Sequence, residues 1–324
     1  NKNLSNIYPI GSLPNKFAYY CNEGYDLIKF KTDRFGLRNK DTKWESVANK
    51  SNIFTIGDSF THGACVPGNS TIASNVEDLS KINTINLGMG GSGPYEYMAV
   101  MKTMLNPIIS SSNKKNTVLL IFYDNDNVKI NNRKEKLLAS SKSIVKINQN
   151  DEIFPTKYYT KNLISFIKEN YPTSKELMIS EVRNNSKELK IKLSPFYKIL
   201  TLQPIRKRII QIKVQKYHEK NKPNFSIISP SQKAISLLSD ICKNNCTPNV
   251  VYIPNNEQWR PNIHSKLYKN KLKKITKDLG INFIDTEEVI DKYSLKDYAP
   301  KGIHLSIDGY RKVSKLITEK IGEL

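Results

Sequence analysis

The chain has 324 residues, of which 38% are hydrophobic, and its formal net charge is +21 at pH 7. This length allows one large domain or two small ones, and the composition is that of a soluble globular protein with a sizeable core. The longest apolar run, NTVLLIFY at 116–123, has the length of a buried strand, and no run reaches the roughly 18 residues of a membrane-spanning segment.

In chain order, residues 1–50 lack a clear period and carry turn signals such as PNK and NEG. They predict an irregular N-terminal arm with a short hairpin. From residue 51, short apolar strands alternate with helical stretches. The predicted strands are 52–56, 83–87, 117–123, 249–253 and 281–284, and the predicted helices are 70–81, 94–105, 231–243, 263–279 and 308–322. This alternation predicts an α/β fold whose parallel sheet binds ligands at the carboxyl ends of its strands.

The alternation is interrupted between about residues 129 and 230. This stretch is basic, has helical periodicity and is interrupted by prolines at positions 155, 172, 195, 204 and 223. We therefore predict a mainly helical insertion at 129–230, between the third and fourth strands of a core that comprises 51–128 and 231–324.

The cysteines are Cys21, Cys65, Cys242 and Cys246. The pair in CKNNC is too isolated for a zinc site, because no second pair of ligands follows it. An even count allows two disulfides in an exported protein and equally four buried thiols in a cytosolic one. The bridge that we expect first is the one between Cys242 and Cys246.

The stretch NIFTIGDSFTHG, at 52–63, turns abruptly after an apolar strand. Gly57 permits a sharp turn, and Ser59 then lies at the carboxyl edge of the sheet, at the start of a predicted helix whose backbone N–H groups favour developing negative charge. This pattern is typical of a nucleophilic serine. Taken alone, however, the tripeptide favours an ordinary turn with a capping serine.

Two further segments end at the same edge. The second strand runs into NLGMGGSGP, at 86–94, whose glycines bring backbone N–H groups close to a ligand, although a flexible loop or a phosphate cradle would look similar. The third strand ends in FYDNDN, at 122–127, where the side-chain amide of Asn125 could donate to an oxyanion. Asx turns that cap the strand are the alternative for this segment.

A candidate base follows the fifth strand, in YAPKGIHLSIDGY at 298–310. His304 returns to the carboxyl edge, and a neutral imidazole is a suitable general base for a serine near pH 7. The remaining histidines are weaker candidates. His62 is too close to Ser59 along the chain, His218 lies in the basic insertion, and His264 begins a helix.

Together these segments resemble the motif blocks of the SGNH, or GDSL-type, hydrolases, over roughly residues 30–127 and 230–324. The matching positions are Gly57-Asp58-Ser59, then Asn86 with Gly91 (Gly88 being the alternative), then Tyr123-Asp124-Asn125-Asp126, and finally Lys301-Gly302-Ile303-His304. The resemblance implies a three-layer, flavodoxin-like fold. It also implies a serine nucleophile at Ser59, a base at His304, and an oxyanion hole from Ser59, Gly91 and Asn125.

Two positions depart from the family pattern. Tyr123 replaces a glycine, which would narrow the site. Lys301 stands where the family has the acid that orients the histidine, and a lysine cannot accept the imidazole N–H. Asp297 or a backbone carbonyl is then expected to orient His304. We expect Asp58 and Asp126 to brace the loops rather than to transfer protons.

The leading hypothesis is therefore a serine esterase that removes O-acetyl or other short acyl groups from a carbohydrate, without metal or cofactor. If the acyl group passes to a sugar hydroxyl instead, the same residues make an O-acetyltransferase of bacterial cell-surface polysaccharide. A third hypothesis is a non-catalytic protein that binds an acidic glycan or a membrane surface, with Lys301 as the sign of lost activity.

The positive charge is concentrated at 187–222, where eleven lysines or arginines face only Glu188 and Glu219. This stretch could lie on an anionic membrane surface, bind an acidic polysaccharide, or simply pack its apolar face on the core. No recognition motif supports nucleic acid as a partner.

The location is indicated by a second, weaker resemblance. FKTDRFGLRN, at 30–39, is similar to the segment that precedes the first block in exported bacterial members of the family. The chain starts at Asn1 rather than methionine, which is compatible with a removed signal peptide or N-terminal membrane anchor. We therefore expect an extracytoplasmic protein.

Overall fold

The computed structural model describes residues 10–127, 142–150, 152–170, 229–243, 245–257 and 265–322. Its centre is a sheet of five parallel strands: β3 (Asn52–Ile56), β4 (Asn83–Asn86), β5 (Asn116–Tyr123), β8 (Cys246–Ile253) and β9 (Asn282–Asp285). The order across the sheet is β4-β3-β5-β8-β9, which is the flavodoxin-like order of a doubly wound α/β fold. The predicted fold class is therefore confirmed.

Alternation of side chains between the two faces of the sheet explains why the central strand β5 contains a long apolar run. In β5, Val118, Leu120 and Phe122 enter one hydrophobic core, whereas Leu119, Ile121 and Tyr123 enter the other. A strand that is covered on both faces must be apolar at consecutive positions, as NTVLLIFY is.

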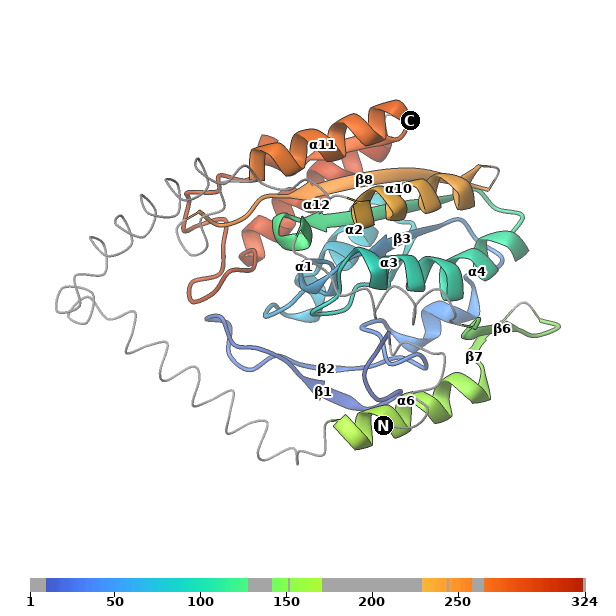
Figure 1. The fold of residues 1–324 in the computed structure, drawn as a ribbon. Helices are drawn as coiled ribbons and strands as arrows, with labels where there is room; N and C mark the ends of the chain where they lie inside the picture. The colour runs from blue at the N-terminus through green and yellow to red at the C-terminus, as the bar shows by residue number, and fades with distance from the viewer. Residues whose placement is uncertain are drawn as a thin grey trace.

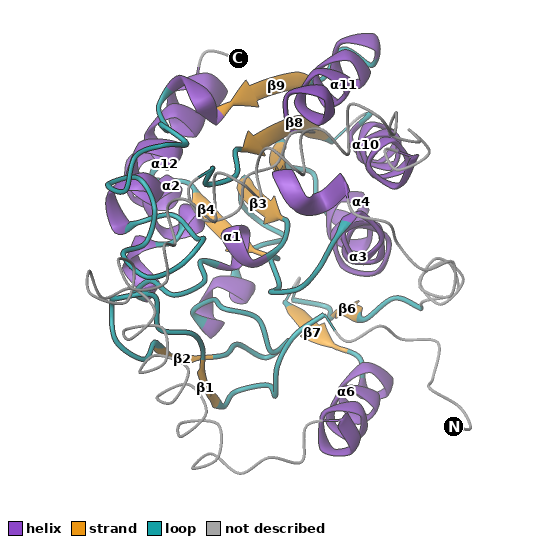
Figure 2. Ribbon diagram, turned by 60° about the vertical axis from the view of Figure 1, so that its left-hand side comes forward, coloured by secondary structure: helices purple, strands orange, loops and turns teal. Residues whose placement is uncertain are grey.

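Helices cover both faces of this sheet (Figures 1 and 2). One layer contains α2 (Ile72–Ser80) and α12 (Ile307–Gly322), which pack against each other. The opposite layer contains α3 (Pro94–Val100), α4 (Asn106–Ser111), α10 (Ser229–Cys242) and α11 (Ser265–Asp278). The predicted helices agree with these to within a few residues, except at α3.

The helix that was predicted to end at residue 105 continues to Ser111 through a π-helical segment, η3 (Met101–Leu105). Pro107 follows this segment and has no backbone N–H, so it cannot bond to the carbonyl of Thr103 one turn earlier. That carbonyl accepts instead from the backbone N–H of Ile144, at 3.0 Å. The proline therefore marks a change in helix geometry rather than its end.

The N-terminal arm contains the expected hairpin, formed by β1 (Phe17–Tyr19) and β2 (Lys29–Lys31) in antiparallel register. A short 3₁₀ helix, η1 (Asp41–Glu45), follows before β3. Another small hairpin, β6 (Val145–Ile147) with β7 (Ile153–Pro155), lies in the predicted helical insertion, where no strand was expected. Helix α6 (Lys157–Asn170) comes next. The basic stretch 187–222 lies outside the described residues.

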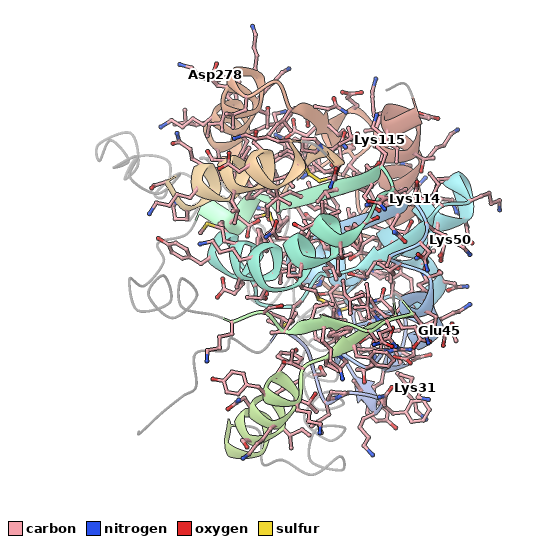
Figure 3. All side chains as sticks on the ribbon, turned by 90° about the vertical axis from the view of Figure 1, so that its right-hand side faces the viewer. Lys31, Glu45, Lys50, Lys114, Lys115 and Asp278 are labelled. Atoms are coloured by element: carbon pink, nitrogen blue, oxygen red, sulfur yellow. A yellow bond between two sulfur atoms is a disulfide. The ribbon has the colours of Figure 1, made fainter. Side chains whose placement is uncertain are left out.

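Charged side chains project outward from the described surface, as Figure 3 shows for Lys114 and Lys115 at the turn before β5 and for Lys50 before β3. These three lysines lie at the amino edge of the sheet, opposite the edge at which Ser59 begins its helix. Of the helices that the structure describes, none is both long and apolar enough to cross a membrane.

One buried carboxylate organises the segment FKTDRFGLRN. Asp33 is fully buried, and its Oδ1 accepts from the backbone N–H groups of Phe35 at 2.9 Å and Leu37 at 2.8 Å. Its Oδ2 accepts from Asn39 Nδ2 at 2.9 Å and from Trp44 Nε1 at 2.8 Å. Four donors from one short segment therefore bond to a single side chain. These bonds fix the backbone conformation of this part of the arm.

We expect Asp33→Ala to lower the free energy of unfolding by about 3 kcal/mol or more, because it leaves buried donors without an acceptor. Asp278→Ala, at an exposed position at the end of α11, is the control and should change stability by less than about 0.5 kcal/mol. Urea denaturation of both variants measures the difference. Equal stabilities of the two variants would show that the conformation of the arm does not depend on Asp33.

Candidate active site

Ser59 lies where the local sequence requires a tight turn. It is the first residue of α1 (Ser59–His62), and Asp58 caps this helix by accepting from the backbone N–H of Phe60 at 2.9 Å. A side chain at Gly57 would collide with Thr61 Oγ1 and with the carbonyl oxygen of Ile121 in the neighbouring strand β5. Only glycine fits there, so the turn from β3 into α1 brings the serine to the carboxyl edge of the sheet.

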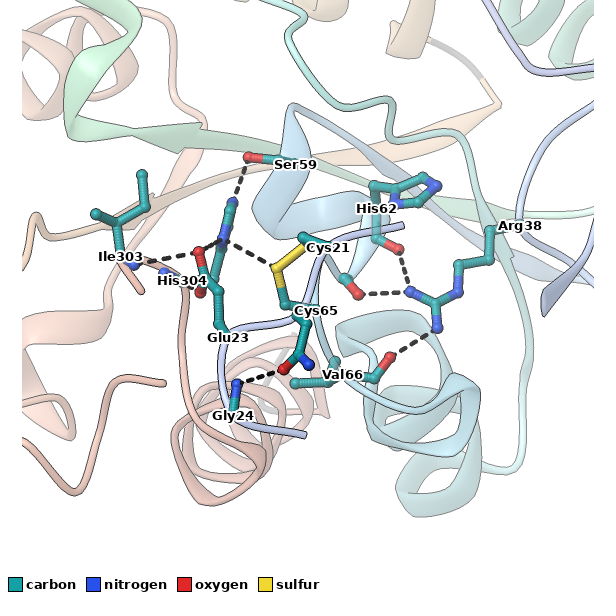
Figure 4. The surroundings of a disulfide bond; sticks show 12 residues. Cys21, Glu23, Gly24, Arg38, Ser59, His62, Cys65, Val66, Ile303 and His304 are labelled. Carbon is teal, nitrogen blue, oxygen red and sulfur yellow. Dashed lines mark hydrogen bonds and ion pairs between the residues drawn. A yellow bond between two sulfur atoms is a disulfide. The ribbon is translucent and has the colours of Figure 1, made fainter. Parts of the chain in front are cut away.

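The Ser59 hydroxyl is hydrogen-bonded to the imidazole of His304, and the imidazole is hydrogen-bonded to a carboxylate (Figure 4). Ser59 Oγ is 2.9 Å from His304 Nε2, and His304 Nδ1 is 2.9 Å from Oε1 of Glu23. A carboxylate only accepts, so the hydrogen of the neutral ring lies on Nδ1. Nε2 then has a lone pair that can accept the hydroxyl proton of Ser59.

Glu23 is fixed by backbone as well as by the ring. Its Oε2 accepts from the N–H of His304 at 3.1 Å, and its Oε1 accepts from the N–H of Ile303 at 3.3 Å. The N–H of Lys301 donates to the backbone carbonyl of Glu23 at 2.9 Å. A Cβ at position 302 would overlap the carboxyl group of Glu23, so Gly302 provides the space in which this side chain lies.

Asp297, which we expected to orient His304, lies elsewhere. Its carboxylate accepts from Lys312 Nζ at 2.6 Å and from the backbone N–H of Asp291 at 2.9 Å. The prediction was wrong because it considered only acids near His304 in the sequence, whereas Glu23 is 281 residues away from it. The available signal was Cys21, two residues before Glu23, whose disulfide partner is Cys65, shortly after Ser59.

The two candidate oxyanion donors in the glycine-rich segment after β4 differ in whether their N–H group is already bonded. The N–H of Gly88 donates to Asn86 Oδ1 at 2.9 Å, so that group is already engaged. Gly91 has φ of +76°, and the space around its Cα is open. No acceptor within the described part of the chain takes its N–H. Asn125 belongs to η4 (Asp124–Asn127), directly after β5, but its side chain lies outside the described set.

The two aspartates expected to brace the loops are both buried. Asp126 accepts from the hydroxyl of Tyr97 at 3.0 Å and from the backbone N–H of Tyr123 at 3.0 Å. Burial raises the pKa of Asp126 well above its ordinary value, and the nearby charge of Asp58 raises it further. Burial also raises the pKa of Asp58, to about 6.

An aromatic wall supports the histidine. The ring of Phe60 stacks on Tyr123, with centroids 4.0 Å apart, and approaches the His304 ring at 4.9 Å. Tyr123 itself is fully buried and donates its hydroxyl hydrogen to Asn255 Oδ1. The large residue at the family's glycine position therefore packs beneath the site.

The second histidine near the site, His62, is buried and does not contact Ser59 in the described hydrogen bonds. Its ring packs on Tyr20 at 5.0 Å and Phe30 at 5.4 Å. Burial and the charge of Arg38 lower the pKa of His62 to about 3, so this ring stays neutral at physiological pH. His218 and His264 lie outside the described residues.

Both disulfides lie within the described residues. Cys242 pairs with Cys246, as predicted, and Cys21 pairs with Cys65. Glu23, Cys65 and His304 are close enough to form a metal-ligand group, but the Cys65 sulfur is bonded to another sulfur and supplies no thiolate. These residues therefore do not make a metal site in the oxidised protein.

The sequence matches no protein-family model, and no curated protein matches it either. The structure is similar to a lipolytic protein of the G-D-S-L family from Veillonella parvula, with 12% identity, 85% of this chain and 100% of that chain covered, and a TM-score of 0.45. It is also similar to a carbohydrate acetylesterase from Sinorhizobium meliloti (10% identity, 85% and 99% covered, TM-score 0.42). An acetylxylan esterase from Geobacillus stearothermophilus gives 11% identity, 86% and 96% coverage and a TM-score of 0.41. At these scores the likeness carries no conclusion about activity.

The raised pKa of Asp58 predicts how stability depends on pH. Between its ordinary value of 3.8 and about 6, the folded protein keeps a proton that the unfolded chain releases. The stability that Asp58 contributes is therefore complete below pH 4 and is lost as the pH rises through 6. An asparagine at position 58 would keep a side-chain oxygen that can cap α1, but it would not ionise.

We expect the unfolding free energy of Asp58→Asn to rise, relative to the unmodified protein, by about 2–3 kcal/mol between pH 4 and pH 7. Denaturant unfolding at each pH measures it, with Asp278→Asn as the exposed control. A difference that does not change with pH would contradict the raised pKa.

Proposed function

We propose that this protein is a serine esterase that removes short acyl groups, in particular O-acetyl groups, from carbohydrate. The observation that carries the proposal is the continuous hydrogen-bonded series from Ser59 through His304 to Glu23, at the carboxyl edge of the parallel sheet. A nucleophile, a base and a group that orients the base are the three parts of an activated hydroxyl.

In the proposed reaction, His304 Nε2 takes the proton of Ser59 as Oγ attacks the ester carbonyl. The ring becomes an imidazolium, and the adjacent carboxylate of Glu23 stabilises its positive charge while holding Nδ1–H in place. His304 then gives the proton to the departing alcohol, which leaves an acyl group on Ser59. A water molecule, activated by the same ring, releases the acyl group.

The developing negative charge on the carbonyl oxygen needs donors. The backbone N–H groups of Ser59 and Gly91 and the side-chain amide of Asn125 are the groups that we assign to this role. The positive φ and open surroundings of Gly91 support its assignment. Each donor of this type typically contributes about 3 kcal/mol to stabilisation of the transition state.

Glu23 also answers the main objection to an active enzyme. The hypothesis of a non-catalytic binding protein depended on Lys301 at the position of the missing acid. Lys301 holds the backbone of Glu23, and Glu23 supplies the carboxylate. An acyltransferase would use the same acyl-enzyme and differ only in the acceptor, so the products distinguish it from a hydrolase.

The carbohydrate substrate and the extracytoplasmic location are supported by the sequence resemblance rather than by the site geometry. Two disulfides agree with this location, since such bridges persist in oxidising compartments.

We expect Ser59→Ala and His304→Ala each to lower hydrolysis of p-nitrophenyl acetate by at least about 10³-fold, because either change removes the activated nucleophile. Ser111→Ala, at an exposed position at the end of α4, is the matched control and should leave the rate unchanged. If the unmodified protein is no faster than Ser59→Ala, it is not a simple esterase. Acetyl transfer to an added glycan, without release to water, would identify the transferase.

The role of Glu23 is tested by a pair of variants. Glu23→Ala should lower kcat about 10- to 100-fold, since the ring loses its orienting acceptor. Gly302→Ala should have a similar effect, because its new methyl group would occupy the place of the Glu23 carboxyl group.

These two effects should not multiply when the substitutions are combined, since both act on one side chain. Asp297→Asn is the control for an acid that does not touch the ring, and it should keep kcat within about threefold, a change of under 1 kcal/mol. Independent, multiplying effects of Glu23→Ala and Gly302→Ala would contradict the assigned geometry.

A further inference from the structure

Glu23 belongs to the loop that joins β1 to β2, residues 20–28, and not to the α/β core. Two hydrogen bonds join the loop to the segment that carries His304. The N–H of His304 donates to Glu23 Oε2, and the N–H of Lys301 donates to the Glu23 carbonyl. At its start the N–H of Tyr20 bonds to the carbonyl of Ile28 at 2.9 Å, which closes the loop on itself. Tyr25 of the loop also accepts from the N–H of Ile307 at 3.4 Å, and Tyr20 packs on His62. Each of these contacts can break on its own, so a covalent attachment would restrain Glu23 further.

The disulfide between Cys21 and Cys65 is that attachment (Figure 4). It joins two residues that are 44 positions apart in the sequence. Cys21 is only two residues before Glu23, and the Cys65 sulfur is 3.7 Å from Nδ1 of His304. The bridge therefore lies beside the ring atom that Glu23 holds.

The Cys65 end of the bridge is rigid. Cys65 is fully buried and has a φ of +62°, which non-glycine residues seldom adopt. The guanidinium of Arg38 donates to the carbonyls on either side of it, at Gly63 and at Val66, the latter at 2.8 Å. The N–H of Ala64 bonds to the carbonyl of Ser59 at 2.9 Å. The sulfur thus projects from the same turn that carries the candidate nucleophile.

We propose that the Cys21–Cys65 disulfide is a positioning element that keeps Glu23 on His304, so that esterase activity requires this bridge to be oxidised. This inference rests on the proposed function, because it concerns the same site. The bridge joins the loop that carries Glu23 to the turn after α1.

The chemistry of opening is a two-electron reduction. A dithiol such as dithiothreitol gives two electrons and two protons, the sulfur–sulfur bond breaks, two thiols form, and the reagent becomes its own disulfide. The loop then keeps its hydrogen bonds and nonpolar contacts but loses its covalent link to the core. In addition, the Cys65 thiol is left close to His304 Nδ1, where it competes with the Glu23 carboxylate for the ring.

The chain provides a matched control, because its second disulfide joins Cys242 at the end of α10 to Cys246 at the start of β8. This is the amino edge of the sheet, away from Ser59. We expect Cys21→Ser with Cys65→Ser to lower kcat about as much as Glu23→Ala does, roughly 10- to 100-fold. Cys242→Ser with Cys246→Ser should keep kcat within about threefold, a change of under 1 kcal/mol.

A combined variant separates positioning from general support of the fold. If the bridge acts through Glu23, adding Glu23→Ala to the Cys21→Ser, Cys65→Ser protein should cost less than about threefold further in kcat, because the carboxylate is already displaced. If Glu23→Ala costs its full factor in that background, the bridge does not position Glu23 and the proposal is overturned.

The bridge can also be opened by reducing the folded protein, so this test does not require the Cys21→Ser, Cys65→Ser variant to fold. In the Cys242→Ser, Cys246→Ser protein only the Cys21–Cys65 bridge remains, so dithiothreitol acts on it alone. We expect activity to fall on reduction and to return on reoxidation. Activity that persists after thiol titration shows both cysteines reduced would overturn the proposal.

A readout without turnover distinguishes this proposal from the proposed function. With ¹⁵N-histidine, NMR observes four histidines, and His304→Gln assigns the signal of interest. The Nδ1-protonated form of His304 should be present in the oxidised protein and lost on reduction, as it is in Glu23→Ala. If it persists on reduction, the positioning role fails, whether or not the protein hydrolyses esters. If it is lost in a protein without esterase activity, the bridge does position Glu23 and it is the proposed function that fails.

Discussion

The candidate site depends on one interaction, the hydrogen bond from His304 Nδ1 to the Glu23 carboxylate. It sets the tautomer of the ring and leaves Nε2 able to accept from Ser59. The same carboxylate accepts the backbone N–H groups of Ile303 and His304, so it also shapes the loop that carries the base. A single side chain from the N-terminal arm therefore completes a site whose other parts belong to the α/β core.

This arrangement explains the elaborate packing of the arm. The buried Asp33 collects four donors, and Arg38 holds the turn that ends in Cys65. Neither residue touches Ser59 or His304 in a described contact. Asp33 fixes the part of the arm that follows the Glu23 loop, and Arg38 fixes the turn to which the Cys21–Cys65 bridge joins that loop. The arm therefore acts as a structural part of the site.

Much of the fold could be predicted from the sequence because its physical cause is local. A strand that is buried on both faces is largely apolar at consecutive positions, and β5 satisfies this requirement within its own residues. Ser59 and His304 could likewise be found from short segments, since the turn at Gly57 and the loop before α12 determine where each side chain lies.

The parts that could not be predicted depend on contacts between distant segments. Glu23 reaches His304 across 281 residues. The nearby Cys21 points to the site only through its disulfide partner Cys65, which the sequence alone does not identify. The continuation of α3 past residue 105 depends on Ile144, which takes the carbonyl that Pro107 cannot use. In both cases the determining group comes from another segment of the chain.

The most direct test of this account is the rate at which a small fluorophosphonate labels the protein, followed by identification of the modified peptide. The account predicts one label per chain, on Ser59, formed much more slowly in Glu23→Ala and absent in Ser59→Ala. Labelling at another residue, or a rate that does not depend on Glu23, would contradict a serine nucleophile activated through His304 and Glu23.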